Sequence, residues 1–315
     1  MTPRSITLPS YAKVNLYLNV LGKRSDGYHE LVTLFERIDL KDEITLERMT
    51  RSSIEVFCAD WRVPTDRTNC AAKAAEAYCK AAHISEGVRI TIDKKIPVSG
   101  GLGGGSSNAA TVLKGLQQMY GNPLSEDRIS EIARTLGSDV PFFLYRQAFA
   151  LGTGRGDEIQ PLDFQPDLWH LLVAPGFPIS TKEVYQAFVL TASGGDVKLL
   201  QAALKSNDFV RIRSLLFNAL EPTVEALYPA IGDVKAAIQT AEGISCPMVS
   251  GSGSTVMALY LSQRQAEAAA ERISARMKDK SARRKDGFAN SFGEQEPGWQ
   301  VFVVKTNTSC PVVQR

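Results

Sequence analysis

The sequence predicts an α+β protein, and three observations carry this prediction. Polar and apolar residues of strand type alternate in the first part of the chain, for example at residues 13–20. An alanine-rich stretch at residues 69–82 and the segment at residues 107–120, which follows a glycine cluster, have helical composition and spacing. The second half indicates helices packed around a smaller sheet.

The strands and helices are expected in the following order. In the first half, strands cover residues 13–20, 30–40, 43–47, 53–58 and 88–92, and a further strand ends at residues 96–97. After Pro141 we expect more strands, divided by a glycine-rich turn at residues 152–156. The second half contributes strands at residues 168–174, 247–249, 255–261 and 299–304, and helices at residues 181–189, 196–205, 210–216, 226–241 and 263–278. The charged, glycine-containing segment at residues 278–298 is expected to be a mobile surface loop.

Length and composition limit the class of protein. The chain has 315 residues, 44% of them hydrophobic and 22% charged, which is typical of a folded protein with a buried core. This length indicates either two domains that share a cleft or one large domain. The formal net charge is only +2, so no broad electrostatic field favours nucleic acid or an anionic membrane as the main partner. Any bound anion must therefore be held locally.

The cysteines and the N-terminal residues favour a cytoplasmic location. Five cysteines stand far apart without a CxxC pair, and we expect free thiols packed as small hydrophobic residues: Cys58, Cys70, Cys79, Cys246 and Cys310. The first ten residues lack the apolar stretch of a secretory signal, and no apolar run is long enough to span a bilayer. Two histidines, His83 and His170, lack metal-ligand spacing and are expected to be structural.

The strongest functional signal is the segment PVSGGLGGGSSNAA at residues 97–110, in which five glycines precede two serines and a helix. Glycines let successive backbone N–H groups point at an anion, and the helix behind them adds the positive end of its dipole. We expect nucleotide phosphates to bind along this segment, at Pro97, Val98, Ser99, Gly100, Gly101, Leu102, Gly103, Gly104, Gly105, Ser106 and Ser107. Because no carboxylate cluster for Mg²⁺ is evident, the hydroxyl of Ser106 or Ser107 is the candidate ligand of a phosphate-bound ion.

This glycine pattern differs from the common nucleotide motifs. No lysine follows the glycines as it does in a P-loop, and the dinucleotide fingerprint fits poorly. The alternative is a flexible hinge, which would not explain so many glycines beside two serines at a helix start. A second glycine–serine segment, MVSGSGSTVM at residues 248–257, would by itself be a hairpin turn. Together the two loops indicate a cleft that holds a polyphosphate or its acceptor.

A third segment, PSYAKVNLYLNVLGKRSDGYHELVTLF at residues 9–35, completes a resemblance. With the two loops it resembles the three motifs of the GHMP kinase superfamily, whose members phosphorylate galactose, homoserine, mevalonate and related alcohols. The segments AKVNLYLNVLGKRSDGYHEL, LGSDVPFFL and AFALGTGRGDEI are most similar to the branch that phosphorylates 4-diphosphocytidyl-2-C-methyl-D-erythritol at its 2-hydroxyl in non-mevalonate isoprenoid synthesis. The resemblance covers residues 10–305 apart from the charged segment.

The resemblance implies a two-domain α+β fold with a deep cleft. The N-terminal domain, residues 1–165, would have a ribosomal S5 domain 2-like topology and bind the nucleotide. The C-terminal domain, residues 166–315, would have an α/β-plait-like topology, add substrate contacts and close the cleft. The resemblance further implies ATP and Mg²⁺ as cofactors and a small-molecule acceptor linked to cytidine diphosphate, and we expect a monomer or a weak homodimer.

The resemblance also assigns catalytic roles to Lys13 and Asp139. An alcohol hardly ionises near neutral pH, so a carboxylate must accept its proton as it attacks the γ-phosphate. Asp139 would be this base, and Lys13 would orient it and favour its charged form. From the residues alone, Asp139 could instead cap a helix after Gly137 and Ser138, and Lys13 could be an exposed strand residue.

Five further residues match the family's contacts with the acceptor. Tyr28 and His29 match the pair that surrounds the cytosine, by ring stacking and by hydrogen bonds to the base edge. Tyr185 would add a second aromatic wall, and Asn15 and Thr181 would contact the methylerythritol hydroxyls. Taken alone, His29 would also fit a solvated turn.

Two alternatives to this function remain. Another GHMP kinase, of homoserine or mevalonate type, would share both glycine-containing loops, and the Tyr28–His29 pair argues against it. A catalytically inactive relative that binds a metabolite would keep the fold, because a fold alone does not imply chemistry. The presence of both Lys13 and Asp139 argues against that alternative.

Overall fold

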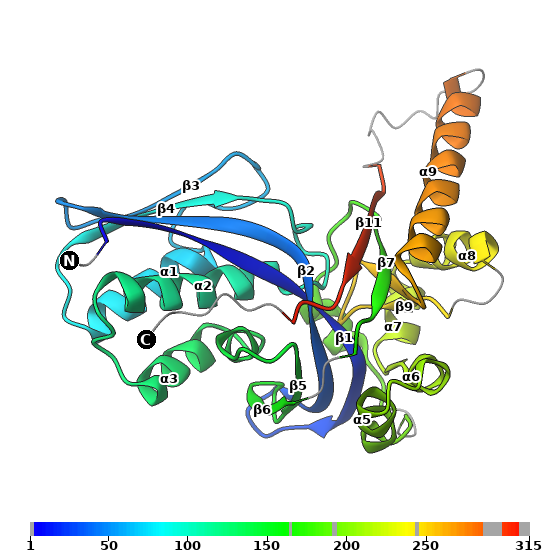
Figure 1. Ribbon diagram of the computed structural model, residues 1–315, viewed down its shortest axis with the longest axis horizontal. Coiled ribbons are helices and arrows are strands. Elements are labelled where there is room, and N and C mark those ends of the chain that lie inside the picture. The colour runs from blue at the N-terminus through cyan, green and yellow to red at the C-terminus, as the bar shows by residue number, and fades with distance from the viewer. Residues whose placement is uncertain (1–2, 164–165, 191–193, 243–245, 286–297, 309–315) are drawn as a thin grey trace.

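The computed structural model describes residues 3–163, 166–190, 194–242, 246–285 and 298–308, and these ranges form two sheets with helices packed on them (Figure 1). The strands of the larger sheet are β1 (Ser5–Lys23), β2 (His29–Met49), β3 (Ile54–Cys58), β4 (Gly87–Asp93), β5 (Phe149–Thr153), β6 (Glu158–Leu162) and β8 (Phe217–Asn218). The strands of the smaller sheet are β7 (Trp169–Ala174), β9 (Met248–Val249), β10 (Val256–Tyr260) and β11 (Gln300–Lys305). The larger sheet has the order β3-β4-β2-β1-β8, with β5 paired to β2 and β6 paired to β5, and the smaller has the order β11-β7-β10-β9.

A long antiparallel hairpin of β1 and β2 forms the spine of the larger sheet (Figure 1). The prediction of two shorter strands at residues 30–40 and 43–47 was wrong, because Lys41 and Asp42 remain paired with Tyr11 and Ser10. Three register shifts interrupt the pairing. One end of β2 pairs with β4 and the other with β5, so this strand connects distant parts of the sheet.

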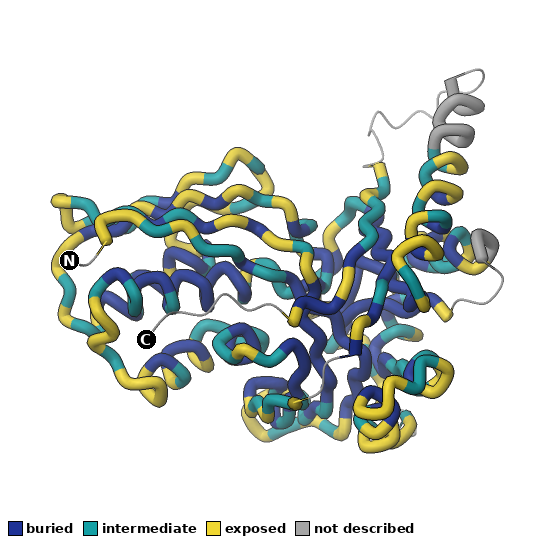
Figure 2. The backbone as a smooth tube through the Cα atoms, in the orientation of Figure 1, coloured by how far each residue is buried: buried dark blue, intermediate teal, exposed yellow. Residues whose placement is uncertain are grey.

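Two helices cover one face of the larger sheet, α1 (Cys70–Ala81) and α2 (Gly104–Met119), and a third, α3 (Glu126–Leu136), packs on them on the side away from the sheet. Figure 2 shows that α1 and α2 are largely buried. The Asn69 side chain caps α1 by accepting a hydrogen bond from the Ala71 amide, as expected at a helix start. Helix α2 begins three residues earlier than predicted, inside the glycine run, and α3 was not predicted.

The segments on either side of α2 and α3 also differ from the prediction. Strand β4 ends at Asp93, so residues 96–97 do not belong to a strand. A short 3₁₀ helix, η1 (Pro141–Leu144), replaces the strand expected directly after Pro141. Proline fits the first turn of a helix because its missing N–H would have no partner there.

The second half of the chain supplies six helices within the described residues: α4 (Thr181–Ala187), α5 (Val197–Lys205), α6 (Phe209–Leu215), α7 (Glu221–Leu227), α8 (Ala230–Glu242) and α9 (Gln263–Lys285). The single helix predicted at residues 226–241 is divided into α7 and α8, because Pro229 lies between them and cannot continue a helix. Helix α9 extends to Lys285, which corrects the loop predicted at residues 278–298 over its first part. Residues 286–297 of that predicted loop lie outside the described residues.

The two sheets share a hydrophobic core. It joins Leu16 of β1 and Leu34 of β2 to Leu172 of β7 and Leu259 of β10, all of them buried. Strand β8, from the second half of the chain, pairs in parallel with β1. The halves are therefore interleaved at their junction, and the domain boundary after residue 165 stays a prediction.

A buried carboxylate–imidazole pair also links the sheets. His170 Nε2 of β7 lies 2.9 Å from a carboxylate oxygen of Glu36 on β2, and both side chains are fully buried. The Thr306 hydroxyl donates to the other carboxylate oxygen at 2.7 Å and accepts a hydrogen bond from the Leu168 amide. This contact gives His170 a structural role.

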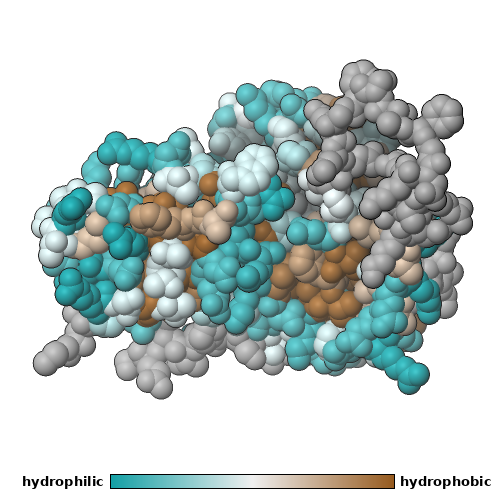
Figure 3. Space-filling model, turned by 90° about the horizontal axis from the view of Figure 1, so that it is seen from above, coloured by the Kyte–Doolittle hydropathy of each residue, from teal (hydrophilic) through white to brown (hydrophobic). Residues whose placement is uncertain are grey.

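The helices of the described ranges do not meet the requirements of a membrane span. None of them has both the length and the apolar content to cross a bilayer. On the face seen in Figure 3, apolar patches are divided by hydrophilic side chains.

The four cysteines in the described ranges are free thiols, and Cys310 lies outside these ranges.

Removing one partner of the buried pair should destabilise the protein. In His170→Leu, Glu36 would stay buried with Thr306 as its remaining side-chain partner among the described residues, so we expect a loss of about 3–5 kcal/mol in the free energy of unfolding, measured in urea. The double variant Glu36→Leu/His170→Leu should recover part of this loss, because no charge is then left buried. Native stability in His170→Leu would contradict the account.

Candidate active site

A cavity of about 1170 Å³ is lined by residues from both halves of the chain. The structure brings nearly all the predicted site residues together around it: Lys13, Asn15, Tyr28, His29, Pro97, Val98, Ser99, Gly100, Gly101, Leu102, Gly103, Gly104, Gly105, Ser106, Asp139, Thr181 and Tyr185. Ser107 is the exception. Its side chain is buried, and its hydroxyl lies 2.8 Å from that of Ser10 on β1, so of the two serines only Ser106 lines the cavity.

The glycine-rich loop, residues 97–106, passes close to neighbouring segments at two positions that only glycine fits well. Gly101 has a φ of +75°, and a Cβ added there would lie 2.2 Å from the Ser250 carbonyl oxygen. Gly103 is the N-cap of α2 with a φ of +69°, and a Cβ there would lie 2.9 Å from Cγ of Lys13. Glycine adopts positive φ without steric cost, so both positions depend on it.

The start of α2 offers backbone amides to the cavity. The Ser107 amide donates to the Gly103 carbonyl at 2.8 Å and closes the first helical turn. The amides of Gly104, Gly105 and Ser106 come before that bond, so they have no acceptor within the helix, and their residues line the cavity. Such amides, at the positive end of a helix dipole, are suited to bind phosphate oxygens.

The second glycine–serine loop, residues 250–254, is hydrogen-bonded to the first. The Thr255 amide donates to the Gly100 carbonyl at 3.1 Å, and the Ser250 hydroxyl donates to the Gly101 carbonyl at 3.2 Å. The Asn218 amide group of β8 donates to the Gly251 carbonyl at 2.8 Å, which ties this loop to the larger sheet. Gly251 and Ser252 of this loop line the same cavity as the glycine-rich loop, so the two loops border one cleft as the sequence indicated.

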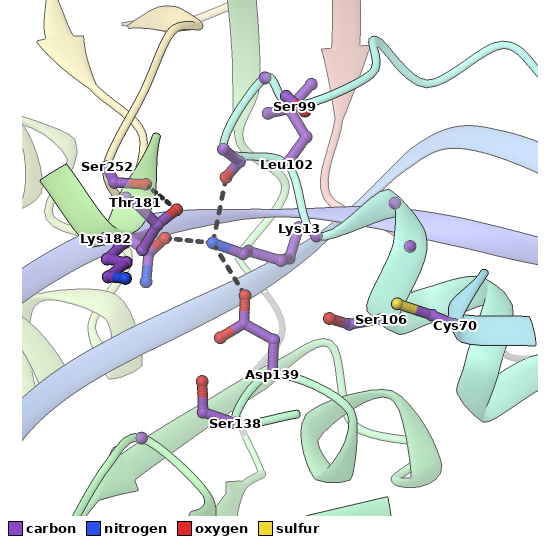
Figure 4. Close-up of a pocket in the computed structure, with 18 of the residues that line it drawn as sticks. Lys13, Cys70, Ser99, Leu102, Ser106, Ser138, Asp139, Thr181, Lys182 and Ser252 are labelled. Atoms are coloured by element: carbon purple, nitrogen blue, oxygen red, sulfur yellow. Dashed lines mark hydrogen bonds and ion pairs between the residues drawn. The ribbon is translucent and has the colours of Figure 1, made fainter. Parts of the chain in front are cut away.

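The ammonium group of Lys13 joins three segments of the site (Figure 4). Its Nζ donates to Oδ1 of Asn15 at 2.6 Å and to the Gly101 carbonyl at 3.0 Å, and it lies 3.5 Å from Oδ2 of Asp139. The Lys13 side chain is 4% exposed, whereas Asp139 is 30% exposed and opens to the cavity. A buried cation with fixed acceptors thus faces an accessible carboxylate, which is a suitable arrangement for a general base.

Neither of the alternative roles that the sequence left open for Lys13 and Asp139 fits the structure. Lys13 is not an exposed strand residue, because it is buried in β1. Asp139 is not a helix cap, because the N-cap of η1 is Val140 and no side chain caps that helix. Both residues are instead held at the cavity.

The polar residues predicted to meet the acceptor hydroxyls are bonded to neighbours. The Asn15 side chain accepts from Lys13 and donates through Nδ2 to the Thr33 hydroxyl at 2.8 Å, so it orients the ammonium group. The hydroxyls of Thr181 and Ser252 lie 2.7 Å apart and connect α4 to the second loop (Figure 4).

Aromatic side chains gather at another part of the cavity. The His29 ring lies 5.1 Å from that of Tyr185 and 6.3 Å from that of Phe188, between ring centroids. Burial, helped by the positive charge of Lys23, lowers the pKa of His29, so its imidazole is neutral near pH 7 and has both a donor and an acceptor nitrogen. Burial raises the pKa of the Tyr185 phenol, and the charge of Asp139 adds to this shift.

Positive charge dominates the lining. Asp139 supplies the carboxylate, whereas the cations among the described lining residues are Lys13, Lys23, Lys94, Arg155 and Lys182. Lys13, Lys94 and Arg155 are paired with carboxylates, so within the described residues Lys23 and Lys182 are the lining cations that favour a polyanionic ligand. The small formal net charge of the whole chain did not predict these cations, because they are concentrated locally at the cavity.

Sequence reasoning missed Lys94, which lies beside the start of α2. Its Nζ is bonded to Asp42 at 2.9 Å and would lie 3.2 Å from a Cβ added to Gly104. Burial lowers the pKa of Lys94, and the Asp42 carboxylate opposes this shift. A further missed set lines the cavity ahead of and at the start of α1: Val63, Pro64, Thr68, Asn69 and Cys70. Their spacing in the sequence carries no ligand motif.

Comparison with known proteins supports the resemblance found in the sequence. The family model described as GHMP kinases N terminal domain matches residues 69–147, and the model described as GHMP kinases C terminal matches residues 200–279. A protein of Desulfotalea psychrophila named 4-diphosphocytidyl-2-C-methyl-D-erythritol kinase is 42% identical over 251 residues, which cover 79% of this chain and 83% of that protein.

Solved structures show the same relationship. A crystal structure of 4-(cytidine 5'-diphospho)-2C-methyl-D-erythritol kinase matches with a TM-score of 0.75 at 32% identity, over 96% of this chain and 100% of that one. A homoserine kinase from Cytophaga hutchinsonii matches with a TM-score of 0.74 at 22% identity, over 98% of this chain and 96% of that one, and this likeness concerns the fold alone. The predicted two-domain α+β fold is thereby confirmed. Since the extensive sequence identity lies with the first of these enzymes, the chain belongs to the 4-diphosphocytidyl-2-C-methyl-D-erythritol kinase family of the GHMP kinases.

Proposed function

We propose that this chain transfers the γ-phosphoryl group of ATP to the 2-hydroxyl of 4-diphosphocytidyl-2-C-methyl-D-erythritol, a step of non-mevalonate isoprenoid synthesis. The observation that carries the proposal is the accessible carboxylate of Asp139, 3.5 Å from the buried ammonium of Lys13 and in the same cavity as the glycine-rich loop. The relatives that bear this enzyme's name support the choice of acceptor.

The reaction is a direct displacement. The amides of Gly104, Gly105 and Ser106 and the dipole of α2 bind the phosphates of ATP. Asp139 accepts the proton of the acceptor hydroxyl while the hydroxyl oxygen forms a bond to the γ-phosphorus, and the bond from that phosphorus to ADP breaks. Lys13 orients Asp139. Because the hydroxyl oxygen attacks the γ-phosphorus directly, no covalent enzyme intermediate is required.

Mg²⁺, which the family implies, would neutralise charge on the ATP phosphates. Among the described residues there is no group of three or more His, Cys, Asp or Glu that could hold a metal ion. Ser106 offers a hydroxyl beside the glycine-rich loop, whereas the Ser107 hydroxyl is buried against Ser10. The ion would therefore be held mainly by the phosphates, with Ser106 as the protein ligand.

The acceptor binds at the part of the cavity that contains the aromatic side chains. Tyr28 stacks on the cytosine, His29 bonds to the base edge, and Tyr185 supplies a second wall. Asn15 and Thr181 contact the methylerythritol hydroxyls. The nearby cations Lys23 and Lys182 match the diphosphate, a group that homoserine and mevalonate lack. We further propose a monomer or weak homodimer in the cytoplasm, consistent with free thiols in the described ranges.

A transfer assay tests this function. The purified chain is incubated with ATP, Mg²⁺ and either 4-diphosphocytidyl-2-C-methyl-D-erythritol, mevalonate or homoserine, and ADP release is followed together with phosphorus NMR of the product. We expect a 2-phosphate product from the first acceptor alone. Transfer to mevalonate or homoserine instead would overturn the acceptor, and no transfer to any of them would indicate an inactive relative.

Asp139→Asn should nearly abolish turnover. The amide cannot accept the proton, so we expect kcat to fall by roughly 10²- to 10⁴-fold, while the Kd for ATP stays close to the native value. Steady-state ADP release and calorimetric titration with ATP measure the two effects. Asp163→Asn, an exposed carboxylate that does not line the cavity, is the matched control. Near-native turnover in Asp139→Asn would remove this residue as the base.

The affinity for the acceptor should depend on the protonation of His29. Its lowered pKa means that the imidazole is neutral near pH 7, and protonation as the pH falls through that pKa removes the acceptor nitrogen, so the KM for the acceptor should rise. Lys23→Gln removes a charge that lowers the pKa, so the rise should begin at a higher pH, on top of a higher KM at every pH because Lys23 also faces the diphosphate. The measurement is the acceptor KM between about pH 5 and pH 8 with saturating ATP. An acceptor KM that stays constant from pH 8 to pH 5 in the native protein would refute this role of His29.

A further inference from the structure

Arg155 lines the cavity from the turn between β5 and β6, and the proposed mechanism gives it no role. Its guanidinium carbon lies 4.9 Å from the centroid of the Tyr28 ring. This distance is within the range of a cation–π contact, which extends to about 6 Å. Tyr28 is 56% exposed, so the guanidinium leaves much of the ring accessible.

Two contacts hold Arg155 in this position. Its guanidinium lies 2.6 Å from Oδ2 of the largely buried Asp157, and its own backbone amide donates to Oδ1 of the same carboxylate at 3.3 Å. The turn itself is fixed to β2, because the Leu31 amide donates to the Gly154 carbonyl at 2.7 Å. Since Asp157 compensates the charge of Arg155, the flat guanidinium can stack on a ring at low electrostatic cost.

The position of the Tyr28 ring is less well determined without Arg155. The Tyr28 amide donates to Oδ1 of Asp26 at 3.1 Å, and the Tyr28 carbonyl accepts from the Arg24 amide at 2.8 Å. Both bonds are made by the backbone and place no constraint on the side-chain torsions. In the described part of the chain, Arg155 is the cation that lies over this ring.

We propose that Arg155 is a positioning residue that holds the Tyr28 ring with one face covered and the other open to stack on the pyrimidine of the acceptor. A ring that already has its bound orientation loses less side-chain freedom when the ligand arrives, so affinity increases without any contact between Arg155 and the ligand. This inference rests on the proposed function, because it requires Tyr28 to stack on the base.

The test is a double-mutant cycle of Arg155→Ala and Tyr28→Ala. The Kd for cytidine 5'-diphosphate is measured by calorimetry while the ATP site is saturated with a non-hydrolysable ATP analogue. We expect Tyr28→Ala to raise this Kd by roughly 5- to 150-fold, as loss of base stacking should. Arg155→Ala should raise it by roughly 2- to 30-fold, as loss of a cation–π contact should. The double variant should bind about as weakly as Tyr28→Ala alone.

Further measurements separate positioning from a general loss of structure. The Kd for the ATP analogue should stay native in Arg155→Ala, whereas the thermal unfolding midpoint should fall, because the largely buried Asp157 loses its cation. Arg155→Lys should recover only part of the affinity, because an ammonium group lacks the planar surface that stacks on a ring. Arg62→Ala is the matched control, since Arg62 pairs with Asp60 two residues away and does not line the cavity. Arg62→Ala should leave the Kd for cytidine 5'-diphosphate and the Kd for the ATP analogue unchanged.

The outcomes distinguish this inference from the function on which it rests. If Tyr28→Ala weakens binding and Arg155→Ala does not, the positioning role is wrong and the proposed function stands. If Arg155→Ala weakens binding equally with and without Tyr28, the guanidinium acts on the ligand directly, which also overturns the positioning role. If neither variant changes the Kd, the base does not stack on Tyr28, and the acceptor site under the proposed function fails.

Discussion

The geometry of the candidate site depends on the three acceptors that surround the buried ammonium group of Lys13. Its three acceptors are Oδ1 of Asn15, the Gly101 carbonyl and the carboxylate of Asp139, and they belong to β1, the glycine-rich loop and the turn before η1. A buried cation is costly unless its hydrogen bonds are made, so the fold is most stable when all three segments meet. The same contacts bring the carboxylate and the loop into one cavity. Folding and the proposed chemistry therefore require the same geometry.

Much of the fold could be predicted because many of its signals are local. The alanine-rich sequence and the cap at Asn69 determine α1 over a few neighbouring residues. The continuity of β2 could not be predicted, because the polar residue Asp42 resembles a strand end in the sequence. In the structure it is fully buried and accepts hydrogen bonds from the Lys95 and Ile96 amides, more than fifty residues away along the chain. The two-residue strand β8 is likewise defined only by its pairing with β1.

In the site, too, some residues could be predicted from the local sequence, whereas others depend on contacts with distant segments. The glycine-rich loop could be predicted because its glycines are nearly consecutive in the sequence. Lys94 and Arg155 could not, because their contacts at the cavity involve partners that are distant from the loop in the sequence. One detail could have been foreseen. Successive residues of a helix point about 100° apart, so Ser106 and Ser107 could not both face the phosphates. The structure places Ser106 at the cavity and buries Ser107.

The most direct test of this account is the coupling between Lys13 and Asp139, measured as kcat in a double-mutant cycle of Lys13→Met and Asp139→Asn. If Lys13 acts by orienting Asp139, each single variant should lose most of the turnover, and the double variant should be little worse than Asp139→Asn. Losses that simply multiply in the double variant would show that the two residues act independently. That result would contradict the central role given to their contact.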